Sequence, residues 1–186
     1  MDFNKDLLLI DIEATGLDAQ KHEIIQLAGI LLDKKTLKEK EAFSSFIKPA
    51  RWKNRDPESM AVNKITWEQL KDAPDLKSTL EKFNKTFGRE VILSYYVGIM
   101  DVTFLQAAYK RAKMEWPFDY HTFNVWGAFY TFLALKNRLK NKKDFGGFNL
   151  GDLVKRFKIK VDKAQLHDAL VDCRVEAEVL RKVVGR

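Results

Sequence analysis

The feature that most constrains this chain is an apolar strand that runs directly into two carboxylates. The stretch 7–17 reads LLLIDIEATGL, and the chain is long enough, at 186 residues with 46% hydrophobic residues, to bury such a strand in one globular domain. A continuous apolar run before a turn is typical of a central strand covered on both faces. Because alternate side chains share one face of a strand, Asp11 and Glu13 are expected to point the same way.

Two neighbouring carboxylates at the end of a buried strand repel each other and lose hydration, which costs free energy unless a cation or hydrogen-bond donors compensate. A divalent metal with oxygen ligands, such as Mg²⁺, suits this pair and suits phosphoester chemistry. The alternative is that Asp11 and Glu13 only flank the turn at Thr15 and Gly16 and face solvent. Other carboxylates must converge on the pair if the metal site is real.

Two further segments supply candidates. Asp101 follows an expected strand at 91–96 and precedes residues with helical spacing, where an acid is also favoured simply by the helix dipole. Residues 166–180 predict an amphipathic helix that carries His167 and Asp172 near its start. An imidazole at the entry to that helix could take a proton from water beside a metal held by Asp172. A surface histidine and an acidic helix start are the alternatives.

The remaining pattern predicts an α/β fold. Residues 23–33 and 41–48 are expected to form a hairpin around a turn at 34–36. The expected helices are 65–70, 76–83, a helix after Asp101, 123–139, 150–157 and 166–180. Cys173 is the sole cysteine, so no intramolecular disulfide can form, and a cytoplasmic location is expected. We expect Cys173 to pack in the core rather than to pair with His167 as a nucleophile. The N-terminal residues fit neither a signal peptide nor a membrane span.

The charge is unevenly distributed and favours a polyanionic partner. The net charge is +7, and residues 91–186 carry 17 basic and 10 acidic side chains, whereas residues 1–90 carry 16 of each. Basic side chains around an acidic pocket suit a nucleic acid that is held by Lys and Arg and cut at a metal. A merely soluble basic surface is the alternative.

Taken together, Asp11-x-Glu13, Asp101 and His167-x4-Asp172 resemble the three exonuclease motifs of the DEDDh family of 3′–5′ exonucleases. The resemblance covers nearly the whole chain and includes the stretch 23–28 after the first motif. It implies an RNase H-like α/β fold with a mixed central sheet, in which three antiparallel strands are followed by parallel strands, and helices on both faces. It also implies that residues 1–186 form a single exonuclease domain.

The resemblance further implies roles for individual residues. Asp11, Glu13 and Asp172 would bind one Mg²⁺ or Mn²⁺ ion, and Asp11 would bridge to a second ion, which Asp101 would help to hold through water. His167 would accept the proton of the attacking water, and a nucleoside 5′-monophosphate would leave. Contacts to the terminal nucleotide would come from the backbone of Ala14 and Thr15 and from the side chain of Leu17.

The middle motif departs from the family pattern. The family usually has His-Asn before the aspartate and Phe directly next to it, whereas this chain has Tyr96, Val97 and Met100 there. The resemblance as a whole predicts hydrolysis of DNA or RNA from a free 3′ end, with single strands favoured. The departure in the middle motif leaves open an alternative function, a nucleic-acid-binding module with weakened catalysis. A metal-stabilised scaffold that binds protein is a third hypothesis. A polymerase or a second copy of the chain could be the protein partner, and no membrane contact is expected.

Overall fold

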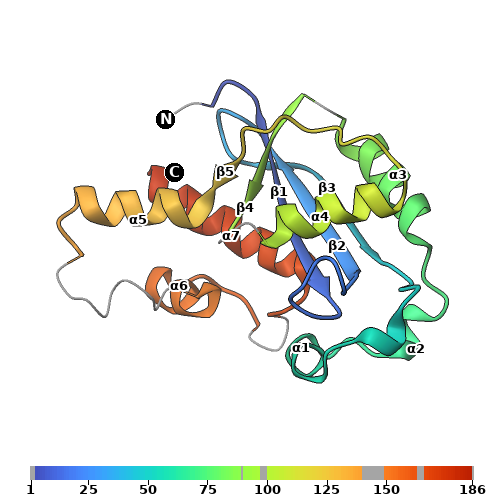
Figure 1. Cartoon of the computed structure of the whole chain (residues 1–186). Helices are drawn as coiled ribbons and strands as arrows, with labels where there is room; N and C mark the ends of the chain where they lie inside the picture. The colour runs from blue at the N-terminus through green and yellow to red at the C-terminus, as the bar shows by residue number, and fades with distance from the viewer. Residues whose placement is uncertain (1–2, 89, 97–99, 140–148, 163–165, 186) are drawn as a thin grey trace.

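The structure is a computed structural model that describes residues 3–88, 90–96, 100–139, 149–162 and 166–185. Its centre is one five-stranded mixed sheet in the order β3-β2-β1-β4-β5, with helices on both faces (Figure 1). The strands are β1 Asp6–Ala14, β2 Ile24–Leu32, β3 Glu39–Phe46, β4 Val91–Tyr95 and β5 Phe123–Asn124. β1, β2 and β3 are antiparallel neighbours, whereas β4 runs parallel to β1 and β5 parallel to β4. The predicted mixed sheet is confirmed.

The helices cover the two faces of the sheet in two groups. They are η1 Trp52–Asn54, α1 Pro57–Asn63, α2 Trp67–Leu70, α3 Leu76–Phe87, α4 Met100–Arg111, α5 Val125–Leu135, α6 Leu150–Phe157 and α7 Ala169–Val184. One core joins β1 to α3 and α4 through Leu8 and Ile10, and the other joins β1 to α5, α6 and α7 through Leu7 and Leu9. Alternation along β1 therefore sends its odd-numbered side chains toward α7.

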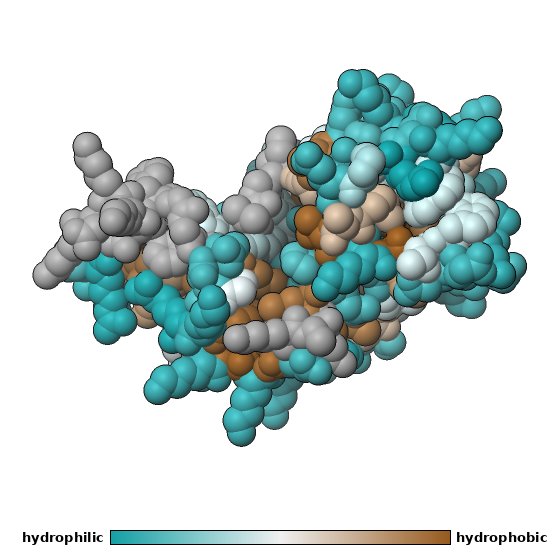
Figure 2. Space-filling view, turned by 90° about the horizontal axis from the view of Figure 1, so that it is seen from below, coloured by the Kyte–Doolittle hydropathy of each residue, from teal (hydrophilic) through white to brown (hydrophobic). Residues whose placement is uncertain are grey.

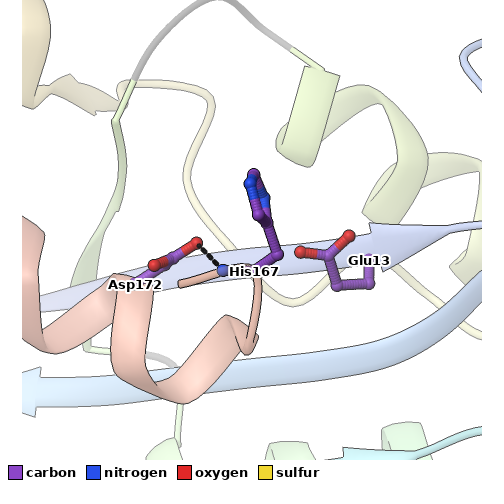
Figure 3. Close-up of side chains that lie close together, drawn as sticks. All are labelled: Glu13, His167 and Asp172. Atoms are coloured by element: carbon purple, nitrogen blue, oxygen red, sulfur yellow. Dashed lines mark hydrogen bonds between the residues drawn. The ribbon is translucent and has the colours of Figure 1, made fainter. Parts of the chain in front are cut away.

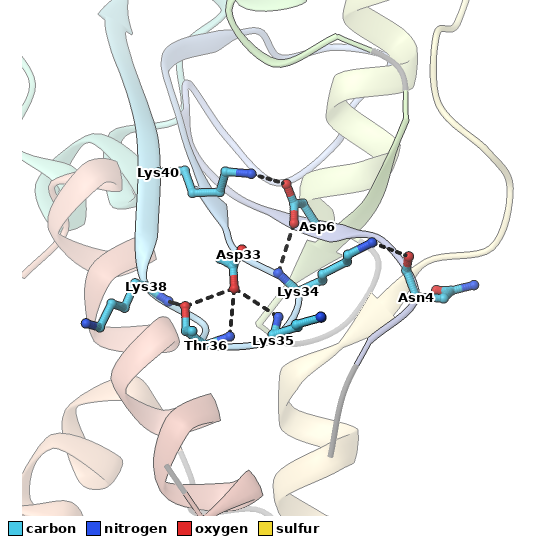
Figure 4. Close-up of polar contacts among 8 residues, drawn as sticks. All are labelled: Asn4, Asp6, Asp33, Lys34, Lys35, Thr36, Lys38 and Lys40. Atoms are coloured by element: carbon cyan, nitrogen blue, oxygen red, sulfur yellow. Dashed lines mark hydrogen bonds and ion pairs between the residues drawn. The ribbon is translucent and has the colours of Figure 1, made fainter.

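The turn between β2 and β3 is built by local hydrogen bonds, as the sequence predicts (Figure 4). The Asp33 carboxylate accepts from the backbone N–H groups of Lys35 and Thr36, at 3.0 and 2.8 Å. Asp6 at the start of β1 accepts from the Lys34 N–H and from the Lys40 ammonium, at 2.9 and 2.8 Å. These bonds hold the hairpin to β1 and so fix its register.

The predicted helix at 123–139 is wrong at both ends. Phe123 and Asn124 pair with the end of β4 as the short strand β5. The Asn124 side chain then caps α5 by accepting from the Gly127 N–H. The helix ends at Leu135, and Asn137 has a left-handed backbone with φ of 51°. A two-residue strand has no alternation to read, so the apolar composition hid it.

The last helix also begins later than predicted. α7 starts at Ala169, and Asp168 caps it by accepting from the N–H groups of Leu170 and Val171. His167 therefore lies outside the helix, with φ of 73°. Cys173 is fully buried in the α7-facing core, as predicted. No helix in the described ranges combines the length and the apolar character that a membrane crossing requires.

Candidate active site

The strand end that carries Asp11 and Glu13 lies beside the start of α7. Both side chains lie on the face of β1 that α7 covers, because they continue the alternation of Leu7 and Leu9. β2 holds this end of β1 through the pairs Asp11↔Ala28 and Glu13↔Gln26, with a bulge after Glu13. The sheet therefore presents both carboxylates to the helix that supplies Asp172.

Three side chains from separate segments converge at this place. Glu13, His167 and Asp172 each offer one ligand atom, and these atoms all lie within 4.8 Å of one another. Figure 3 shows the His167 imidazole between the two carboxylates. The His167 backbone N–H donates to Asp172 Oδ2 at 3.1 Å, which ties the loop before α7 to the first turn of that helix.

Asp101 joins the site from the first turn of α4, which is the next helix after β4 in the chain. It is buried, and burial raises its pKa to about 7, opposed by hydrogen bonds from its own backbone N–H and from that of Ile12. The predicted placement of this carboxylate at a helix start is confirmed. Asp101 thus lies near the end of β1 because it follows β4, which pairs with β1 in parallel.

A cavity of about 550 Å³ opens over these residues. Of the predicted site residues, Asp11, Glu13, Ala14, Leu17, Asp101, His167 and Asp172 line it, and Thr15 does not. The Thr15 N–H donates to Glu23 and its carbonyl accepts from the Asp56 N–H, at 2.9 and 2.7 Å. The backbone of Thr15 therefore already has partners within the protein.

Part of the rim of the cavity is apolar, and α1 forms one side of the cavity. Leu17, Val62 and Met100 line the cavity and are 75%, 54% and 38% exposed. Exposed apolar side chains beside carboxylates are suited to a ligand that has a flat hydrophobic part and an anionic part, provided that a bound cation links the anionic part to the carboxylates. The view from below in Figure 2 shows hydrophobic side chains gathered in the middle of one face and hydrophilic ones around them.

The carboxylates of the cavity raise one another's pKa values. Burial and the charges of Asp172 and Asp101 raise the pKa of Glu13 to about 8, and burial raises the pKa of Asp172 to about 6. Burial and then the Asp101 charge hold the pKa of Asp11 well above its ordinary value. Asp172 Oδ1 is buried without a hydrogen-bond partner among the described residues. A cluster of carboxylate oxygens, one of which has no hydrogen-bond donor, fits a divalent cation such as Mg²⁺ or Mn²⁺.

Gln26 holds the loop that carries His167 against the sheet. Its side-chain N–H donates to Asp168 Oδ2 at 3.0 Å, and its side-chain oxygen accepts from the Ala169 N–H at 3.3 Å. Gln26 is buried on β2 opposite Glu13. One amide therefore fixes both the cap of α7 and the residue next to the histidine.

Replacing Gln26 by Ala is expected to lower the rate of the predicted phosphodiester hydrolysis about tenfold and to destabilise the fold by about 1–3 kcal/mol, because Asp168 and the Ala169 N–H lose their partner. An assay of kcat measures the first effect, and urea unfolding measures the second. The exposed Gln20 provides the matched control, Gln20→Ala, which should change neither. A Gln26→Ala protein with wild-type kcat would show that the loop is held by other contacts.

The structure describes two of the three residues at which the middle motif departs from the family pattern, Tyr96 and Met100. Tyr96 is buried and lines the cavity, and its carbonyl accepts from the Asn124 side chain and from the Trp126 N–H, each at 2.9 Å. Met100 lies on the rim, whereas Val97 lies outside the described residues. The end of β4 is thus held by α5.

Sequence reasoning missed three acidic residues that line the cavity, Asp56, Glu58 and Glu176. Glu176 lies on α7 one turn beyond Asp172, is 1% exposed and lines the same cavity. The spacing of four from Asp172 was the available signal, since such residues share one face of a helix. On a helix rich in charged residues, that spacing alone did not distinguish a buried acid from a surface one.

Comparison with known proteins shows which family this chain resembles. Residues 8–180 match the RNase_T exonuclease family. DNA polymerase III subunit epsilon of Rickettsia prowazekii is 29% identical over 182 residues, which cover 96% of this chain and 73% of that protein.

Two solved structures share the fold. One is E. coli Exonuclease I in complex with a dT13 oligonucleotide, with a TM-score of 0.81 at 17% identity, covering 98% of this chain and 42% of that chain. The other is the nuclease domain of 3′hExo, a DEDDh family member bound to rAMP, with a TM-score of 0.72 at 20% identity, covering 100% and 94%.

Proposed function

Because the chain belongs to the RNase_T exonuclease family and is a 3′–5′ exonuclease, we propose that Asp11, Glu13, Asp101, His167 and Asp172 form its catalytic site. The observation that carries this proposal is the convergence of Glu13, His167 and Asp172, whose ligand atoms lie within 4.8 Å of one another. Asp11 and Asp101 line the same cavity. The residues would act on the phosphodiester bond at a 3′ end of DNA or RNA and release nucleoside 5′-monophosphates.

Two Mg²⁺ or Mn²⁺ ions would be held by the carboxylates, with Asp11, Glu13 and Asp172 at one ion and Asp11 and Asp101 at the other. When bound, such ions activate water and stabilise the charge of the transferring phosphoryl group. The tight carboxylate cluster supports this assignment, since its like charges otherwise raise each other's pKa values.

His167 would accept the proton of the water that attacks the phosphorus. Its exposed ring at the mouth of the cavity can reach incoming water, and the bond from its backbone N–H to Asp172 keeps it beside the carboxylates. A positioned general base contributes a factor of about 10²–10⁴ to a rate. The 3′ oxygen of the preceding nucleotide leaves on the opposite side of the phosphorus.

The apolar rim would bind the terminal nucleotide. Leu17 lies at the mouth of the cavity and would pack against the base, and Ala14 would contact the nucleotide through its backbone. Thr15 would contribute by holding the turn rather than by a direct contact, since its backbone groups are already bonded. Single strands would be favoured as substrate because an unpaired terminal base can enter the cavity without the free-energy cost of breaking a base pair.

We also propose a polymerase as protein partner, supported by the relative that is named as a subunit of DNA polymerase III. A homodimer is the alternative. A cytoplasmic location fits the sole cysteine, which is buried and forms no disulfide. Residues 1–186 would act as one exonuclease domain, which the family match over 8–180 supports.

The direct test is digestion of 5′-labelled single-stranded DNA and RNA with Mg²⁺, Mn²⁺ or EDTA. We expect a ladder that shortens from the 3′ end with either metal and full-length substrate with EDTA. The preferred sugar is read from the two substrates. Salt-dependent binding without a ladder in any metal would instead support a nucleic-acid-binding module with lost catalysis. A protein with no affinity for either oligonucleotide would support the protein-binding scaffold.

A further inference from the structure

Glu176 is buried in the cavity without a function in the mechanism above. It follows Asp172 by one turn of α7 and is 1% exposed. Among the described residues, no donor reaches its Oε2 oxygen, which is as fully buried as the orphaned Oδ1 of Asp172. Two neighbouring turns of one helix therefore each bring a buried oxygen without a partner to the same cavity.

The charges that act on Glu176 are negative. Burial and then the carboxylates of Asp101 and Asp172 hold its pKa well above the ordinary range. No basic side chain of the described residues forms an ion pair with it, although Glu178 on the same helix pairs with Arg181 at 2.8 Å. A buried carboxyl group with an unsatisfied oxygen destabilises the folded protein, so a purely structural role does not explain Glu176.

Glu176 lies outside the tight group of the site. The ligand atoms of Glu13, His167 and Asp172 lie within 4.8 Å of one another, and Glu176 is not among them. Asp11 and Asp101 line the cavity together with Glu176. The carboxyl groups of Asp11, Asp101 and Glu176 therefore face the same cavity as the tight group.

We propose that Glu176 is a fifth carboxylate of the divalent-cation site and binds a cation together with Asp11 and Asp101. The inference rests on the proposed metal-dependent function and adds a ligand to it. A cation bound there would satisfy the Oε2 oxygen and would relieve the repulsion among these three acids.

The test is a titration of the whole protein with Mn²⁺, in which bound Mn²⁺ is measured by calorimetry or by the electron paramagnetic resonance signal of the Mn²⁺ that stays free. Glu176→Gln keeps the shape and removes the charge, and Glu176→Met keeps the length without polar atoms and serves if the Gln variant does not fold. Glu178→Gln on the same helix is the matched control. We expect the Glu176 variants to lose one bound ion or to bind Mn²⁺ at least tenfold more weakly, and the control to bind as wild type does.

Thermal unfolding adds a readout that a structural role would not produce. Without metal, the Glu176 variants should unfold at or above the wild-type temperature, because they no longer bury an unpaired acid. With Mn²⁺, they should show a smaller rise in Tm than wild type. If the Glu176 variants bind Mn²⁺ as wild type does and lose the same amount of Tm with and without metal, the inference about Glu176 is wrong, whereas the proposed function still holds. A wild-type protein that binds no Mn²⁺ would overturn both the inference and the proposed function.

Discussion

Replacing Asp172 by Asn is expected to reduce the exonuclease rate about 1000-fold or more, while the metal-free protein unfolds no more easily than wild type. The loss follows because Asp172 is one of three side chains with ligand atoms within 4.8 Å of one another. The amide is nearly isosteric and can still accept the bond from the His167 N–H, so the loop keeps its anchor. Single-turnover digestion of a labelled oligonucleotide measures the rate.

Stability is the second half of this prediction. Burial raises the pKa of Asp172 to about 6, so its charge is a cost to the folded protein at pH 8 unless a cation is bound. Asn removes that charge. The exposed Asp72 provides the control Asp72→Asn, which should leave rate and stability unchanged. An Asp172→Asn protein with substantial activity would show that the catalytic carboxylates lie elsewhere.

The sequence was sufficient to predict the elements whose signals are local. The strand that ends at Asp11 and Glu13, the hairpin from β2 to β3 and the helix after Asp101 each carry a pattern within a few residues. Asp101 was predictable only as an acid at a helix start. Its approach to Asp11 depends on the parallel pairing of β1 with β4, which no single segment encodes.

The features that sequence reasoning missed depend on contacts across long separations. Gln26 reads as one polar position in an apolar strand, and its bonds to Asp168 and Ala169 span more than 140 residues. Glu176 reads as one of several charges on α7, and only the packing of that helix against β1 and β2 buries it. The short strand β5 exists because β4 offers it a partner. Polar residues of this kind are identified by their surroundings and not by their spacing.

The second large effect is an inverted pH dependence of stability in the metal-free protein. The pKa values of Asp172, Asp101 and Glu13 are raised to about 6, 7 and 8. A raised pKa gives stability that is complete below the unfolded value, near 4, and that is lost as the pH passes through the folded value. The metal-free protein should therefore lose several kcal/mol between pH 5 and 8.5, since one pKa unit corresponds to about 1.4 kcal/mol.

Urea unfolding of the metal-free protein at pH 5, 7 and 8.5 measures this loss, and Asp101→Asn should make it smaller. Surface aspartates such as Asp6, Asp33 and Asp56 have lowered pKa values, so their contribution changes only below pH 4 and leaves this window undisturbed. Equal stability at pH 5 and 8.5 would contradict the raised pKa values.

Mn²⁺ should reverse the slope. A cation binds the deprotonated carboxylates, so its stabilisation grows over the same range in which the metal-free protein weakens. The two curves should therefore diverge as the pH rises, with almost no metal effect at pH 5 and the largest effect at pH 8.5. The repulsion among the carboxylates that destabilises the empty cavity is then the same free energy that makes the cavity bind a divalent cation.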